Sequence, residues 1–170
     1  TLAEACIDGV SADRSVWDRG VLERARFEGA SLISSGFSRT KLDGASFRRA
    51  KLSRSSFMGA AGEAVDFCGA DLESADLRQA KLGELRAADA VLRRANGLKL
   101  SGHGASLVGA DLRGASLRSA RLKGADMSGA CLVDVDLRDA DLEGAKLRGA
   151  DRQGAKLAGA NLRGVDTDEA

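Results

Sequence analysis

One pattern of apolar and polar residues runs through the whole chain with a period of five. Positions whose number is a multiple of five carry small residues, most often Ala. Two positions later comes a large apolar residue, usually Leu, and this class also holds all 5 Phe and the 1 Trp. The other three positions of each five are mostly polar. This period matches neither an α-helix nor a simple strand, whose side chains repeat after about 3.6 and 2.0 residues.

The pattern predicts a solenoid. A single polar residue separates the small and the large apolar residue of each five, which places both on the same side of an extended segment. The chain must then turn before the next five, or the apolar residues would drift out of phase. A chain that turns every five residues forms flat-sided coils, each of which contacts only its neighbours.

Several segments resemble the A(D/N)LXX motif of pentapeptide-repeat proteins. The segments 110–114, 140–144 and 160–164 read ADLRG, ADLEG and ANLRG. The resemblance covers the whole chain. It implies an all-β fold, a right-handed quadrilateral β-helix with four pentapeptides per coil and about eight coils. We expect one such domain over residues 1–170, either alone or as a fragment of a larger protein.

Stacking the sequence in rows of 20 residues supports this coil length independently. The aromatic residues then fall into two columns on opposite sides of the coil, and the five-residue motif does not require this grouping. The columns are Phe27, Phe47 and Phe67, and Trp17, Phe37 and Phe57. Rings stacked one coil apart fit a packed core better than an aromatic ligand site.

The pattern weakens between about Gly83 and Gly104. In two pentapeptides the large and small residues are exchanged, which keeps the core volume roughly constant. These exchanges are Leu85 with Ala87, and Leu100 with Gly102. The inward glycines Gly62 and Gly97 have no such compensation. We therefore expect a local irregularity at Gly62 and another over Gly97–His103.

The two ends differ in polarity. The last members of two inward columns are Arg152 and Thr167, which we interpret as a polar cap. The first coil has Leu2, Ile7 and Trp17 and no such cap. Unpaired strand edges recruit other chains. The sequence therefore predicts an end-on contact through these three residues, with a second copy in an end-to-end homodimer or with a preceding domain of the same chain.

Composition argues against catalysis and against nucleic-acid binding. Lys and Arg number 26 and Asp and Glu 25, so no strong field attracts nucleic acid. The single His103 and the 3 Cys form no catalytic or metal-binding spacing, and the glycines recur at corners rather than in a phosphate loop. We expect no enzyme activity, no cofactor and no metal. No apolar run is long enough for a membrane span. Sparse cysteines fit the cytoplasm.

One side of the predicted coil carries an excess of basic residues. Three of them share one outward column and three more occupy the neighbouring column, and together they form a candidate surface for an acidic partner protein. They are Arg78, Arg118 and Arg138, with Arg19, Arg39 and Lys99. The alternative is a solvated face without a partner.

Two functions remain open. The resemblance implies a non-catalytic protein–protein interaction or scaffold module of a bacterial protein. Association with a secretion system and secretion as an effector are two forms that this module can take in the family. The alternative is a DNA mimic that binds DNA gyrase and gives quinolone resistance, as some members of the family do. A DNA mimic requires a dense negative potential. The near-neutral composition of this chain favours the first function.

Overall fold

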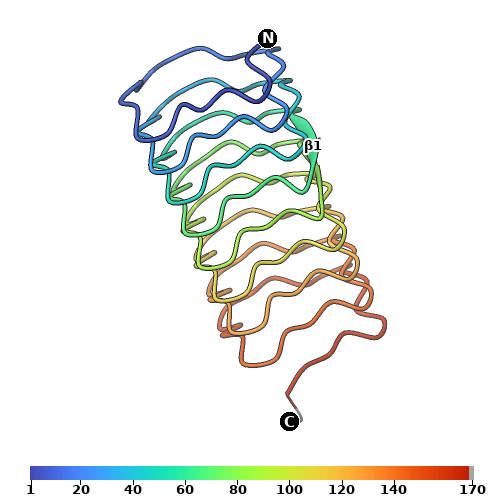
Figure 1. Ribbon diagram of the computed structural model, residues 1–170. Coiled ribbons are helices and arrows are strands. Elements are labelled where there is room, and N and C mark those ends of the chain that lie inside the picture. Colours follow the sequence, from blue (N-terminus) through green and yellow to red (C-terminus); the bar gives the residue numbers. More distant parts are fainter. Residues whose placement is uncertain (169–170) are drawn as a thin grey trace.

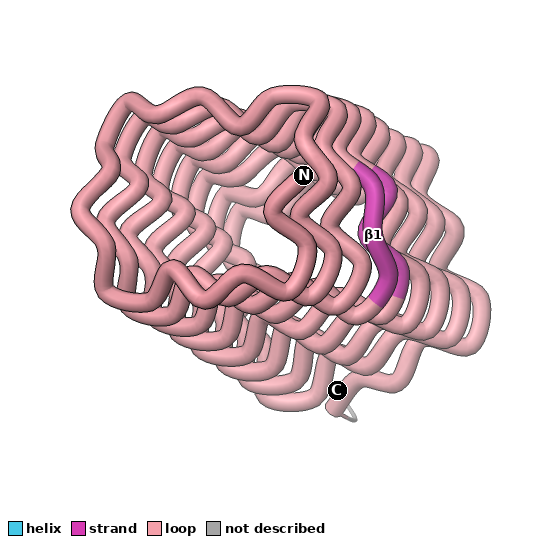
Figure 2. Tube along the Cα trace, turned by 45° about the horizontal axis from the view of Figure 1, so that its top comes forward, coloured by secondary structure: helices cyan, strands magenta, loops and turns pink. Residues whose placement is uncertain are grey.

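The computed structural model describes residues 1–168, and the chain forms a rod of stacked coils with its ends at opposite ends of the rod (Figure 1). Parallel β-bridges join residues that are 20 positions apart, so one coil contains 20 residues. A coil has four bridged positions, which gives it four sides (Figure 2). In the second coil these positions are Val21, Arg26, Ser31 and Gly36. The predicted all-β quadrilateral helix and its coil length are confirmed.

Backbone hydrogen bonds hold each coil to the coils on both sides of it. The NH of Leu112 donates to the carbonyl of Cys131 in the next coil at 2.9 Å, and the NH of Cys131 donates back to Ala110 at 2.9 Å. Longer strands form at one place only in the described chain. These are β1 (Ala61–Glu63) and β2 (Lys81–Gly83), which pair in parallel with Gly62 opposite Leu82.

Sharp corners separate the sides. The corner residue has a number ending in 4 or 9 and a positive φ, a conformation that glycine adopts without strain. Gly59 occupies one such corner with φ 66°. Other corners carry larger residues in the same conformation, such as Arg39 with φ 59°. Because a corner side chain points outward, these positions can carry charge at a modest backbone cost.

The core consists of the inward Ala, Leu and Phe columns. Phe27 and Phe47 are stacked with ring centroids 5.0 Å apart, and Phe37 and Phe57 with centroids 4.8 Å apart. The two aromatic columns also meet across the core. Phe47 and Phe57, for example, lie edge to face at 5.6 Å. The predicted columns are confirmed, and the structure adds that they form one continuous aromatic cluster.

The weak stretch of the pattern is more regular than expected. Leu85 and Leu100 are buried, as the exchange of large and small residues predicts. An irregularity does occur at Gly62, where the extended backbone of β1 replaces the usual bridge and turn. The expected irregularity over Gly97–His103 is wrong, because the bridges and turns continue unchanged there.

Backbone bonding explains why this stretch stays regular. The NH of Gly97 donates to Ser116 at 2.7 Å, and the NH of Leu100 donates to Gly97 at 2.9 Å, as at other corners. These bonds do not depend on the size of the inward side chain. The missing volume appears instead as a small apolar cavity of about 20 Å³, lined by Leu85, Gly97, Leu100 and their neighbours.

Both ends of the rod expose apolar side chains. Arg152 is exposed, as expected for an end residue, and Asp168 accepts a hydrogen bond from the NH of Gly149 at 2.6 Å. However, Leu162 is 44% exposed, almost the same as Leu2 at 43%. The expected difference in polarity between the ends is therefore smaller than the inward columns suggested.

Candidate interaction surface

Ion pairs divide the six basic residues of the candidate surface into two groups. Arg78 binds the carboxylate of Asp76 with two hydrogen bonds, of 2.8 and 2.7 Å. Arg138 binds Asp136 in the same way, at 2.8 and 2.6 Å. Arg118 lies 3.4 Å from Asp139, so its contact is weaker. The charge of this column is therefore largely compensated within the protein.

The paired carboxylates also bind backbone. Asp76 and Asp136 each accept a bond from the NH of the arginine two residues later. The side-chain bond from Arg78 lowers the pKa of Asp76, and the bond from Arg138 lowers the pKa of Asp136 to about 2. The same bonds raise the pKa of both arginines. Each of these Asp and Arg side chains is engaged in hydrogen bonds within its own coil. Arg78 and Arg138 are therefore less suited to bind an external partner.

The other group lies at the corner between two sides of the rod. Arg19, Arg39 and Lys99 occupy left-handed corner positions with φ between 58° and 60°, and all three are exposed. In residues 1–168 none of them forms an ion pair within 4.0 Å. Their charges are therefore available to a partner.

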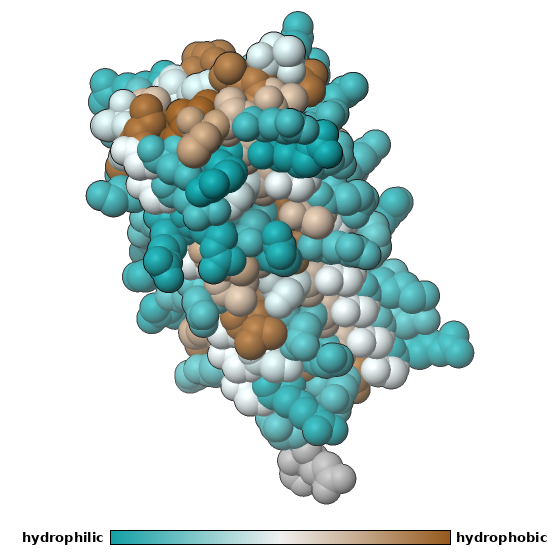
Figure 3. Space-filling view, viewed as in Figure 1, coloured by the Kyte–Doolittle hydropathy of each residue, from teal (hydrophilic) through white to brown (hydrophobic). Residues whose placement is uncertain are grey.

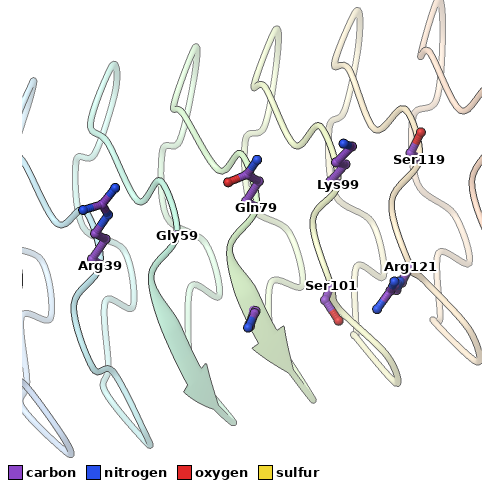
Figure 4. Close-up of a pocket in the computed structure, with 8 residues that line it drawn as sticks. Arg39, Gly59, Gln79, Lys99, Ser101, Ser119 and Arg121 are labelled. Carbon is purple, nitrogen blue, oxygen red and sulfur yellow. The ribbon is translucent and has the colours of Figure 1, made fainter.

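Two further cations complete this corner from the adjoining side. Lys81 and Arg121 line the same open groove of about 630 Å³ as Arg39 and Lys99. We call these four residues the basic corner. Figure 4 shows Arg39, Lys99 and Arg121 spaced along the groove. No carboxylate lines the groove. The remaining lining residues are small or neutral, namely Gly59, Gln79, Ser101 and Ser119.

Lys81 and Arg121 were not among the sequence candidates. Counting charges by side assigns them to a different side from Arg39 and Lys99, although all four line the same groove. The signal that could have found them is the numbering itself. In a 20-residue coil, the residue just before each multiple of 20 occupies one corner, as Arg39 and Lys99 do. The residue just after the same multiple begins the adjoining side, as Lys81 and Arg121 do, so both kinds of residue lie at one corner of the rod.

The candidate end-on residues lie at the N-terminal end of the rod. Ile7 and Trp17 are partly exposed, and Val16 beside them is 78% exposed. The indole Nε1 of Trp17 donates to the hydroxyl of Ser15 at 2.6 Å, which satisfies its polar atom within the chain. Apolar residues gather at this end of the space-filling view (Figure 3). The face is suited to packing against another apolar surface.

Residues that often carry chemistry are scattered. His103 is exposed, and its imidazole, together with the carboxylate of Glu63, fills the space that a side chain at Gly83 would occupy. Cys6, Cys68 and Cys131 are free thiols, and burial raises the pKa of Cys68, which lowers its reactivity. Within residues 1–168 no group of three His, Cys, Asp or Glu side chains is arranged to hold a metal ion. Over the same residues, no helix has the length and apolarity needed to cross a membrane.

The family model for pentapeptide repeats matches this chain in 8 copies. The matched residues are 21–59, 45–83, 70–96, 103–134 and 132–164. The chain belongs to the pentapeptide-repeat family. The structures of its relatives are right-handed β-helices, so the predicted handedness and fold class are confirmed. No curated protein sequence matches this pentapeptide-repeat chain.

Solved structures of other pentapeptide-repeat proteins share the fold. A trypsin-treated variant of QnrB1, a plasmid-mediated fluoroquinolone resistance protein, has a TM-score of 0.89 and 21% identity, over 99% of this chain and 86% of that chain. A second such variant has a TM-score of 0.70 and 20% identity, over 99% and 84%. HetL, involved in heterocyst differentiation regulation in the cyanobacterium Nostoc sp. strain PCC 7120, has a TM-score of 0.53 and 25% identity, over 97% and 90%.

Proposed function

We propose that this pentapeptide-repeat chain is a non-catalytic interaction module that binds other proteins through its outer faces. The observation that carries the proposal is the basic corner, where Arg39, Lys81, Lys99 and Arg121 line one groove without a carboxylate. A protein that needs charge only for solubility can intersperse both signs, as the Asp76–Arg78 pair does elsewhere on the rod. Uncompensated charge in a groove favours recognition of a partner.

Capture of a partner by folded variants tests this proposal. The rod would be immobilised, and proteins retained from a bacterial lysate would be compared between the wild type and variants altered on one face at a time. We expect a specific protein that is lost when one face is changed and retained when the others are changed. Equal retention by every variant, including a chain unfolded by Leu112→Arg, would contradict the proposal.

A contact through the N-terminal end is a second part of the proposal. Leu2, Ile7 and Trp17 would pack against a second copy or against another domain of the same protein, which would cover apolar surface and the free strand edge. Analytical ultracentrifugation of Leu2→Lys with Ile7→Lys tests the homodimer. Leu162→Lys, at the other end, is the matched control. If the double variant still self-associates and Leu162→Lys does not, the contact lies at the C-terminal end of the rod and this part of the proposal is refuted.

We further propose that the module acts in the bacterial cytoplasm or is delivered from it by a secretion system. Free cysteines at three places in residues 1–168 support a reducing compartment. Fractionation of cells that produce the chain, with and without a functional secretion system, tests the location. Recovery only outside the cell with oxidised thiols would contradict it.

The alternative is a gyrase-directed quinolone resistance factor. The TM-score of 0.89 with a QnrB1 variant favours the same rod shape, at an identity of only 21%. The charge pattern favours it less, because the groove of gyrase that binds DNA would meet the basic corner with the same sign of charge. A supercoiling assay with gyrase and a quinolone separates the two functions. Protection of gyrase by this chain would favour the alternative.

A further inference from the structure

We propose that the basic corner binds an extended acidic segment of a partner protein, which lies along the axis of the rod across Arg39, Lys81, Lys99 and Arg121. The inference rests on the proposed function and names the chemistry of the partner. Each of the last three coils of the groove contributes one of its cations, from alternate sides of the corner, as Lys81, Lys99 and Arg121. Their backbones are therefore about 5 Å apart along the axis.

The charges of this groove repel one another in the free protein. Coils elsewhere carry an acidic partner within the same coil, as Asp111 does for Arg113 at 2.6 Å. Within the described chain, no salt bridge compensates any of the four cations of the basic corner. Binding of a polyanion relieves this repulsion, so the field of the groove favours negatively charged partners.

The shape of the groove fits an extended chain. Arg39 and Arg121 are about four coils apart, which is about 20 Å and equals about six residues of extended peptide. Gly59 has no side chain and Ala61, two residues later, has only a methyl group, so little side-chain volume lies between Arg39 and Lys81 in the groove. Side-chain donors follow in the next coils. These are Gln79, Ser101 and Ser119.

The lining favours a peptide over a nucleic acid. Proteins that bind single strands stack the bases on aromatic side chains. The five Phe of this chain are buried in the core, and Trp17 lies at the end of the rod. The groove lining contains no aromatic ring, so it offers charge and hydrogen bonds only. Asp and Glu side chains of a peptide need no more than this.

The groove also has a defined end. In the two columns that form the basic corner, the coil after Ser119 and Arg121 carries Asp139 and Asp141. Arg118 at 3.4 Å partly compensates Asp139, whereas the carboxylate of Asp141 accepts from the neutral amide of Asn161 at 2.9 Å and keeps its charge. The negative charge of Asp141 repels an acidic chain that continues further along the rod. The bound segment should therefore stop near Arg121, which limits it to the length of the groove.

The columns of the repeat suggest variants that keep the fold. Arg39→Gly with Lys99→Gly removes two cations from left-handed corners and inserts the residue that Gly59 already places in the same column. Arg54→Gly with Arg94→Gly is the matched control, because both residues are exposed and occupy another left-handed corner with φ of 59° and 55°. The two variants have equal net charge.

A second pair tests the other side of the groove. Lys81→Ala and Arg121→Ser insert the residues that Ala61 and Ser101 place in that column. Binding would be measured by fluorescence anisotropy of a labelled peptide of about eight Glu and Asp residues at low ionic strength. We expect each groove pair to weaken binding about three- to tenfold and the control pair to leave it within about twofold. Affinity of the wild type should fall as salt rises.

Three results would overturn this inference. They are the absence of peptide binding at low salt, an equal loss in the control and groove variants, and tighter binding of an oligothymidylate of equal charge than of the peptide. The capture experiment separates this failure from failure of the proposed function. A partner that is retained through another face, by a chain without the basic corner, leaves the interaction module standing and refutes the acidic segment alone.

Discussion

Ser35 and Ser55 lie one coil apart in the same inward column, but only the hydroxyl of Ser35 has hydrogen-bond partners. Ser35 Oγ accepts from the hydroxyl of Ser15 at 3.0 Å and donates to the carbonyl of Ala12 at 3.2 Å. Ser55 Oγ is buried without any partner. Four of the eight residues in this column are Ala.

Replacement of these two serines should have opposite effects. Ser55→Ala removes an unsatisfied buried hydroxyl and should raise the free energy of unfolding by about 1 kcal/mol. Ser35→Ala breaks a satisfied network and should lower it by about 1 kcal/mol. Urea denaturation of both variants measures the difference. A loss of stability in Ser55→Ala would show that its hydroxyl has a partner in solution.

Two inward glycines should also respond differently to a methyl group. A Cβ at Gly102 would meet Leu122 at 3.4 Å, an ordinary contact, whereas a Cβ at Gly62 would lie 2.6 Å from the backbone of Leu42. Gly102→Ala should therefore stabilise the rod by about 0.4–1 kcal/mol, because Ala lowers the conformational entropy of the unfolded chain. Gly62→Ala should destabilise it by about 1–3 kcal/mol, because the coil must shift. Thermal melts that rank the two variants in the reverse order would contradict this.

A charge introduced into the middle of the rod should be far more costly than the removal of one at its end. Leu112 is 2% exposed, so Leu112→Arg buries an unpaired charge and should cost about 3–5 kcal/mol. Arg152 belongs to the same column but is exposed, so Arg152→Leu should change stability little. Chemical denaturation of both variants checks this, and equal losses would show that the end coil is packed as tightly as the middle.

The Asp136–Arg138 pair should make stability depend on pH under acidic conditions. The pKa of Asp136 is about 2 in the folded protein, below its ordinary value near 4. The stabilisation is therefore present above about pH 4 and is lost as the pH falls through about 2. In Arg138→Gln the pKa of Asp136, followed by NMR titration, should rise toward its ordinary value. An unchanged titration would assign the shift to the backbone NH instead.

The sequence predicted the core well because the core depends on one repeat length. Once 20 residues make a coil, the positions of Phe27, Phe47 and Phe67 follow. The irregularity expected at Gly97 was wrong, because backbone bonds determine a corner whatever side chain points inward. A cavity absorbs the missing volume instead.

The outer surface was harder to predict. Arg78 and Arg138 counted as free charges in the sequence, yet each lies beside an Asp two residues earlier and binds it. The spacing of the two residues holds this information, but only once both are known to project from the same face. Lys81 was missed because the charges were counted separately for each side of the rod. Lys81 belongs to one side and Arg39 and Lys99 to the next, yet the two sides meet at the corner where all three line one groove.

The register of 20 residues turns a change of chain length into a rotation. Deletion of one whole coil, such as residues 71–90, would leave every later residue in its own column of a shorter rod. Deletion of a single pentapeptide between Arg39 and Lys99 would also preserve the inward pattern, but it would turn everything after it by a quarter of a revolution. Lys99 and Arg121 would then face another direction from Arg39, and the groove would be dismantled without loss of the core. Two rods of this kind can therefore have the same type of core, with Ala and Leu or Phe inward at every side, and differ in the angular phase of their outer residues.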